Sequence, residues 1–80
     1  MTAARKLIAG ASYGGDTLRM IGRAFDDAWA EVAQNYRSPL AVEAARLKLA
    51  NIVLSLAEEG ERSSEQLKDR AVRILCIDEP

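Results

Sequence analysis

The chain has 80 residues and a mass of 8.7 kDa; 49% of the residues are hydrophobic, 29% are charged and none is histidine. This length suits one small domain and is too short for two separate cores, while the apolar content argues against a disordered chain. Eleven Lys and Arg nearly balance twelve Asp and Glu, for a net charge of −1. The composition therefore lacks the basic surplus typical of proteins that bind nucleic acid or anionic membranes.

Residues 1–15 are predicted to form an N-terminal appendage, with a short helix over 2–9 followed by a Gly-rich connector. Arg5 and Lys6 precede the apolar run Leu7–Ala11, which is shorter than the ~7–15 residues of a secretory h-region. No apolar run approaches the ~20 residues needed to span a bilayer. We therefore expect a mature, cytoplasmic protein without a membrane partner.

The segment from Gly10 to Thr17 comes close to the phosphate-binding pattern G-x-x-x-x-G-K-[ST], but Asp16 stands where the pattern has Lys. A carboxylate at that position repels the phosphate charge that the Lys neutralises. The better interpretation is a connector that delivers Asp16 as the N-cap of the following helix.

The first long helix is predicted over about 16–37, because apolar residues recur there at intervals of three and four. Its stripe carries the chain's single Trp, which we expect inside the bundle together with Phe25, whereas Tyr36 is expected to be partly exposed. The stripe consists of Leu18, Ile21, Phe25, Ala28, Trp29, Val32 and Tyr36.

The second helix is predicted over 39–59, with Ser38 as N-cap, Pro39 at its first position and Gly60 as its C-terminal stop. It has two apolar faces. Val42, Ala45, Leu49, Ile52, Val53 and Leu56 form a core stripe, and Leu40, Leu47 and Leu54, spaced by sevens, form a second ladder.

This leucine ladder has two interpretations. Either the other two helices of a monomer cover both faces, or the ladder pairs with a second copy of the chain. Small bundles often gain stability by association, so we favour a homodimer. Arg46 lies between the two faces, with Glu43 on its own helix or Asp26 and Asp27 on the first helix as candidate partners. The candidate interface comprises Leu40, Leu47, Leu54, Arg46 and Tyr36.

The third helix is predicted over 64–77, where Ser63 and Gln66 form a capping-box pattern. Leu67, Ala71, Ile74 and Leu75 supply its apolar stripe, and Cys76 is expected to be buried and inert. With no alternation typical of strands, the prediction is an all-α fold: a three-helix up-down bundle forming a single domain over 16–80.

The residue inventory predicts no catalytic, cofactor-binding or metal-binding residues. Without His there is no Ser-His or Cys-His pair, and the lone Cys76 forms neither an internal disulfide nor a CxxC site. Adjacent carboxylates such as Glu58 and Glu59 diverge on a helix. An enzyme is conceivable only if Glu43, Arg46 and Tyr36 complete a pocket across subunits.

The stretches Gly10–Gly14, Phe25–Trp29 and Ala45–Asn51 resemble a group of short bacterial helical proteins with no assigned function. The resemblance spans nearly the whole chain and implies a small cytosolic bacterial protein, but it brings no functional residue with it.

We therefore expect a non-enzymatic protein-interaction or structural module that binds itself, or another protein, through the middle helix. The alternative is a small nucleic-acid-associated regulator that uses the third-helix cations Lys68, Arg70 and Arg73.

Overall fold

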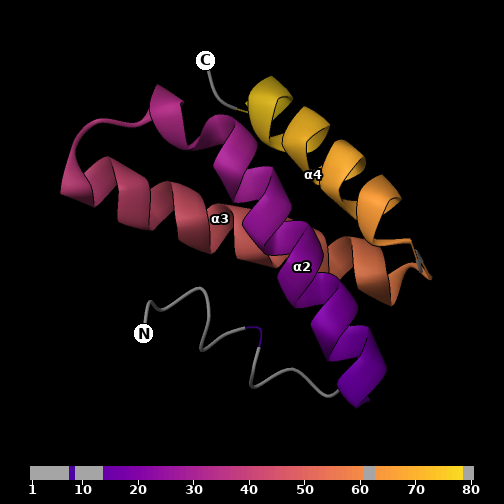
Figure 1. The fold of residues 1–80 in the computed structure, drawn as a ribbon. Coiled ribbons are helices and arrows are strands. Elements are labelled where there is room, and N and C mark those ends of the chain that lie inside the picture. The colour runs from indigo at the N-terminus through magenta and orange to yellow at the C-terminus, as the bar shows by residue number, and fades with distance from the viewer. Residues whose placement is uncertain (1–7, 9–13, 61–62, 79–80) are drawn as a thin grey trace.

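The computed structural model describes residue 8, residues 14–60 and residues 63–78 of the chain. Three α-helices occupy residues 14–60 and 63–78: α2 (Gly15–Val32), α3 (Pro39–Glu58) and α4 (Ser64–Asp78) (Figure 1). A 3₁₀ turn, η1 (Ala33–Asn35), follows α2. The described residues contain no strand. The predicted all-α fold with three helices is confirmed.

Local sequence signals define the starts of α3 and α4. The Ser38 hydroxyl accepts a hydrogen bond from the Ala41 amide at 3.0 Å, and Pro39 occupies the first turn, where no amide donor is needed. The Ser63 hydroxyl accepts in the same way from the Gln66 amide at 3.3 Å. Both predicted caps are confirmed, as is the C-terminal stop, because Gly60 has a φ of 108°.

The first predicted helix differs from the structure at both ends. The N-cap of α2 is Gly14, which makes no side-chain capping bond, and Asp16 instead lies in the first turn, where its carboxylate accepts from Arg19 at 2.8 Å. At the other end α2 stops at Val32, and Tyr36 is extended, with φ −119° and ψ 128°. The prediction that this helix continues to residue 37 is wrong, because the chain turns to bring the Tyr36 ring back to Trp29.

The three helices pack with α2 and α4 side by side, running in the same direction, while α3 crosses behind α2 and returns the chain (Figure 1). The most extensive contact is between α2 and α4. Every buried residue in the described ranges is apolar. The core draws Ile21, Ala24, Phe25, Ala28 and Val32 from α2, Leu49, Ala50, Val53, Leu56 and Ala57 from α3, and Leu67, Ala71 and Leu75 from α4.

Residue 8 is the one described position in the predicted N-terminal appendage before Gly14. Ile8 is helical, 6% exposed and part of the same core. The remainder of the predicted helix over 2–9, and the connector over 10–13, lie outside the described residues.

The stripe predicted for α3 corresponds to the buried face, but the buried arc is wider. Four of the six predicted residues are buried, whereas Val42 and Ile52 are half-buried. Ala50 and Ala57, which the prediction omitted, are fully buried. Small side chains allow neighbouring backbones to approach closely, so these two positions extend the face that the other helices cover.

The stripe predicted for α4 is narrower in the structure. Leu67, Ala71 and Leu75 are buried at intervals of four, but Ile74 is 38% exposed and Ile77 is 79% exposed. Cys76 is exposed, so the prediction of a buried thiol is wrong. Its position, nine residues after Leu67, turns it about 180° away from that residue on a helix.

None of the helices in the described part of the chain is long and apolar enough to cross a bilayer.

Two glycines give opposite predictions for the same substitution. Gly60→Ala should lower the free energy of unfolding by about 1–2 kcal/mol, because an L side chain is strained at a φ of 108°. Gly22→Ala should raise it by about 1 kcal/mol, because Gly22 lies inside α2 and an added Cβ meets nothing within 4 Å. Urea denaturation followed by circular dichroism measures both changes. Equal effects of the two variants would contradict the positive φ of Gly60 and the position of Gly22 inside α2.

Candidate functional site

We define the outer face of α3 as Leu40, Glu43, Ala44, Leu47 and Asn51, all of which are exposed. At about 100° per residue these side chains fall within an arc of roughly 100°, on the opposite side of the helix from Leu49. Leu40 is 82% exposed and Leu47 is 39% exposed. Folding of one chain therefore leaves the first two leucines of the predicted ladder on the surface.

The third leucine of the ladder has a different environment. Leu54 is partly buried and packs against the hydrophobic core. The reason is the crossing of the helices: the end of α3 leads into α4, whereas its beginning extends away from α4 (Figure 1). The ladder thus changes along its length from exposed at Leu40 to half-covered at Leu54.

The other two predicted interface residues, Tyr36 and Arg46, meet at Trp29. The rings of Trp29 and Tyr36 are stacked, with centroids 5.7 Å apart and an interplanar angle of 14°. On a continuous helix, seven residues separate two Cα atoms by about 10 Å along the axis. The extended backbone at Tyr36 is what brings the rings together, and the role of Trp29 as the shared platform was not predicted.

Arg46 completes this aromatic–arginine cluster. Its Cζ atom lies over the Trp29 ring, 5.1 Å from the centroid. A guanidinium group stacks well on an aromatic face because it is planar and weakly hydrated. Its Nε is buried and has no hydrogen-bond partner among the described atoms. The predicted carboxylate partners were Glu43, Asp26 or Asp27; the contact that the structure shows is with the Trp29 ring.

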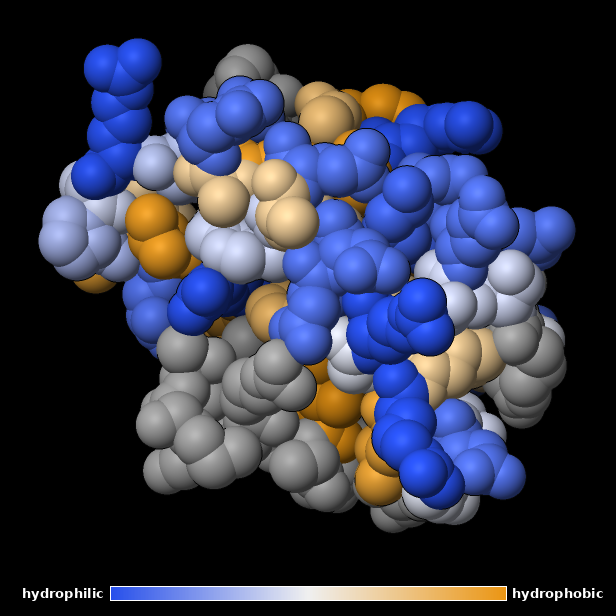
Figure 2. Space-filling view, viewed as in Figure 1, coloured by the Kyte–Doolittle hydropathy of each residue, from blue (hydrophilic) through white to orange (hydrophobic). Residues whose placement is uncertain are grey.

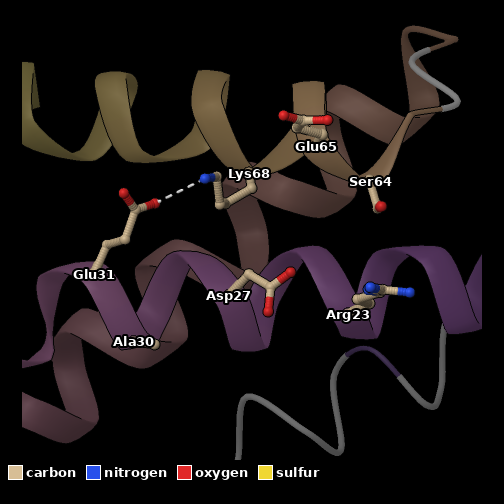
Figure 3. A pocket seen from close by; sticks show the side chains of 7 residues that line it. All are labelled: Arg23, Asp27, Ala30, Glu31, Ser64, Glu65 and Lys68. Carbon is tan, nitrogen blue, oxygen red and sulfur yellow. Dashed lines mark ion pairs between the residues drawn. The ribbon is translucent and has the colours of Figure 1, made fainter.

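A polar hollow of about 370 Å³ lies between α2 and α4 (Figure 3). Side chains of both signs line it: Arg23, Asp27, Ala30 and Glu31 from α2, and Ser64, Glu65 and Lys68 from α4. The Glu31 carboxylate points across the gap to Lys68 (Figure 3), with Oε2 3.3 Å from Nζ, and Asp69 Oδ1 is also 3.3 Å from that nitrogen. This hollow was not predicted, because its two walls come from helices that are distant in sequence.

Hydrogen bonds to Asp69 and then to Glu31 raise the pKa of Lys68 above its usual value of 10.5. The ammonium group therefore stays protonated at neutral pH and lacks the free electron pair that a nucleophile or general base needs. Groups of three or more metal-ligating side chains are absent from the described ranges. The hollow therefore holds an ion pair that joins α2 to α4.

The face formed by α2 and α4 is mostly covered by hydrophilic residues (Figure 2). Of the third-helix cations predicted for nucleic acid, Lys68 pairs with two carboxylates, and both Arg70 and Arg73 lie on the surface. In the described residues, ion pairs therefore lie between α2 and α4, whereas Leu40 and Leu47 are exposed on α3.

Comparison with known proteins finds no matching family model, no similar curated protein and no similar solved structure. The resemblance to short bacterial helical proteins therefore stays a prediction.

The aromatic–arginine cluster can be tested with the chain's one tryptophan. Arg46→Ala should lower the free energy of unfolding by about 1 kcal/mol and shift the Trp29 emission to longer wavelength, because the ring loses its cation and gains water contact. Arg19→Ala is the control, since Arg19 pairs with Asp16 in an exposed position remote from any ring contact. An unchanged emission spectrum in Arg46→Ala would contradict the stacked geometry.

The ion pairs of Lys68 predict a pH dependence. Because the folded pKa lies above the unfolded value, their contribution to stability is fully present below pH 10.5 and is lost as the pH rises through the folded pKa. The difference in unfolding free energy between the wild type and Lys68→Gln should therefore shrink over that range. Denaturant titrations between neutral pH and pH 11 measure it, and a difference that stays constant would contradict the pairing. In a Glu31→Gln background, the Lys68→Gln substitution should change the free energy of unfolding by a smaller amount.

Proposed function

We propose that this protein is a small, non-enzymatic interaction module that associates with itself through the outer face of α3. The observation that carries the proposal is the exposure of Leu40 and Leu47 on one line of a helix whose opposite side carries the fully buried Leu49. Burial of a leucine side chain stabilises by about 1.5–3 kcal/mol. In a two-fold dimer the same leucine is buried in both copies, so each position contributes twice.

The position of these leucines on α3 supports association over further folding. Leu40 and Leu47 lie about 20° apart around the helix and roughly 160–180° from Leu49, which is fully buried. α2 and α4 already occupy the side that includes Leu49. A side chain turned so far from the described core needs a surface from outside the bundle to cover it.

A second apolar pair, Ile74 and Ile77 on α4, suits self-association less well. Each follows an exposed arginine at a spacing of four, Arg70 before Ile74 and Arg73 before Ile77. Two copies that met through this stripe would bring like charges together, which is unfavourable. The outer face of α3 has one residue of each sign beside its leucines, Glu43 and Lys48.

Placement of the protein in the cytoplasm is part of the same proposal. Cys76 is exposed and is the only cysteine of the chain. Exposed thiols persist in the reduced form in reducing compartments. The nucleic-acid alternative stays a prediction that no observation favours, because the pairing of Lys68 with Glu31 and Asp69 removes one of its three cations.

The proposal is tested by one substitution on each exposed apolar pair. The wild type should sediment as a concentration-dependent dimer in the micromolar range. Leu40→Glu should weaken dimerisation at least about tenfold, equivalent to 1.4 kcal/mol, and leave the helical content unchanged because this side chain is 82% exposed. Leu54→Glu is unsuitable, since Leu54 packs on the core.

The matched control is Ile77→Glu, because Ile77 on α4 is 79% exposed. This variant should dimerise like the wild type. A wild type that is monomeric at every concentration would refute self-association, and equal weakening by Leu40→Glu and Ile77→Glu would refute the assignment to α3.

A further inference from the structure

We infer that the second copy lies parallel to the first and in register, so that the two α3 helices form a short two-stranded coiled coil. This inference rests on the proposed self-association and adds its geometry. It comes from the order of residues along the outer face of α3, which follows the seven-residue repeat of such pairs.

The exposed residues of α3 fit this repeat. Leu40 and Leu47 occupy two successive d positions, and Ala44 and Asn51 occupy the two a positions that follow them at a spacing of four. Leucine at d favours two-stranded parallel packing. All four side chains are exposed in the single chain, so each of them is accessible to a partner helix.

Charge order sets the direction of the partner. Glu43 lies at g and Lys48 lies five residues later at e, on the two flanks of the seam. In a parallel pair, g of one helix faces the following e of the other, so two Glu43–Lys48 contacts form across the seam. In an antiparallel pair, each flank meets its own counterpart, and like charges approach one another. The charge order therefore favours a parallel partner.

Asn51 sets the register. A single asparagine at an a position favours parallel dimers, because its amide pairs with the same residue of the partner and is left unpaired in other registers. In the single chain the exposed Asn51 amide donates to the Leu47 carbonyl at 3.2 Å. One amide hydrogen bond per side chain leaves further donor and acceptor capacity for the amide of the second copy.

The ends of the seam predict its strength. It begins at Leu40, directly after the helix start at Pro39, and closes after Asn51, because Leu54 is partly buried against the core. Twelve residues extend about 17 Å. So short a seam gives a small interface, which is typical of a reversible, concentration-dependent dimer.

Reciprocal charge exchange tests the direction. Glu43→Lys and Lys48→Glu should each raise the dissociation constant by roughly tenfold, since attraction becomes repulsion at two symmetric contacts. The double variant Glu43→Lys/Lys48→Glu should restore it to within about threefold of the wild type, because both contacts are regenerated with reversed sign. In an antiparallel dimer the double variant keeps like charges opposed and gains nothing. Sedimentation equilibrium measures the constants, with circular dichroism to verify folding.

Cysteine crosslinking tests the register. In a Cys76→Ser background, Ala44→Cys and Asn51→Cys should both form disulfide-linked dimers under mild oxidation, because every seam position of a parallel dimer faces itself. A two-fold antiparallel pair places only one point of the helix opposite itself, so the two variants cannot both crosslink. Gln34→Cys, exposed on η1, is the control and should stay monomeric on a denaturing gel.

The outcomes separate the two proposals. If the wild type dimerises but the double exchange brings no rescue, or only one of the two cysteine variants crosslinks, the parallel geometry is wrong and self-association stands. If the wild type is monomeric throughout, both proposals fail.

Discussion

Leu49, Val53 and Leu56 bury one side of α3 against the other helices, and this packing fixes which residues of α3 remain outside. Once one side of a helix packs against the core, the rotation of the helix about its own axis is fixed. Because the packed side of α3 includes Ala50 and Ala57, the neighbouring helices reach round one flank and cover part of Leu54. The same setting turns Leu40 and Leu47 outward, so the surface character of the molecule is a direct consequence of its core.

The core contains no buried polar or charged residue in the described ranges, and polar contacts are confined to its margins. At two of these margins, polar side chains connect one helix to another. Glu31 and Lys68 connect α2 to α4 across the polar hollow, and Arg46 covers Trp29 where α2 turns towards α3. Exposed ion pairs add little to stability, whereas the half-buried stack places a cation on an apolar surface. We therefore regard the aromatic–arginine cluster as the stronger constraint on how the first two helices meet.

Features with local causes were predictable from the sequence. Ser38, Pro39, Ser63 and Gly60 define helix ends through their own hydrogen bonds and backbone preferences, and the structure has these ends within a residue or two of the predicted ones. Features that depend on contact between helices were not predictable. The end of α2 at Val32 reflects the stack of Tyr36 on Trp29. The apolar repeat in the sequence continues through residue 36 and gives no sign of that contact.

The candidate site shows the same division. Spacing by sevens predicted that Leu40, Leu47 and Leu54 share a line, but their exposure depends on how far the other helices extend along α3, which spacing does not encode. Arg46 was singled out for its position between two faces, yet its partner proved to be an aromatic ring from another helix. The prediction that Cys76 is buried was wrong for a simpler reason: its apolar neighbours in sequence, Leu75 and Ile77, point in other directions on the helix.

The proposed interface uses a single face of α3, and this has a consequence for the proposed assembly. A self-complementary face joins two copies about a two-fold axis and is then consumed, so the assembly stops at a dimer. Growth into longer assemblies needs a second complementary face, and the α2–α4 side supplies charge pairs that are already satisfied between Glu31, Lys68 and Asp69. The exposed isoleucines of α4 lie beside arginines, which opposes their pairing with themselves. The proposal of closure at two copies therefore rests on the unequal distribution of apolar and charged residues over the bundle.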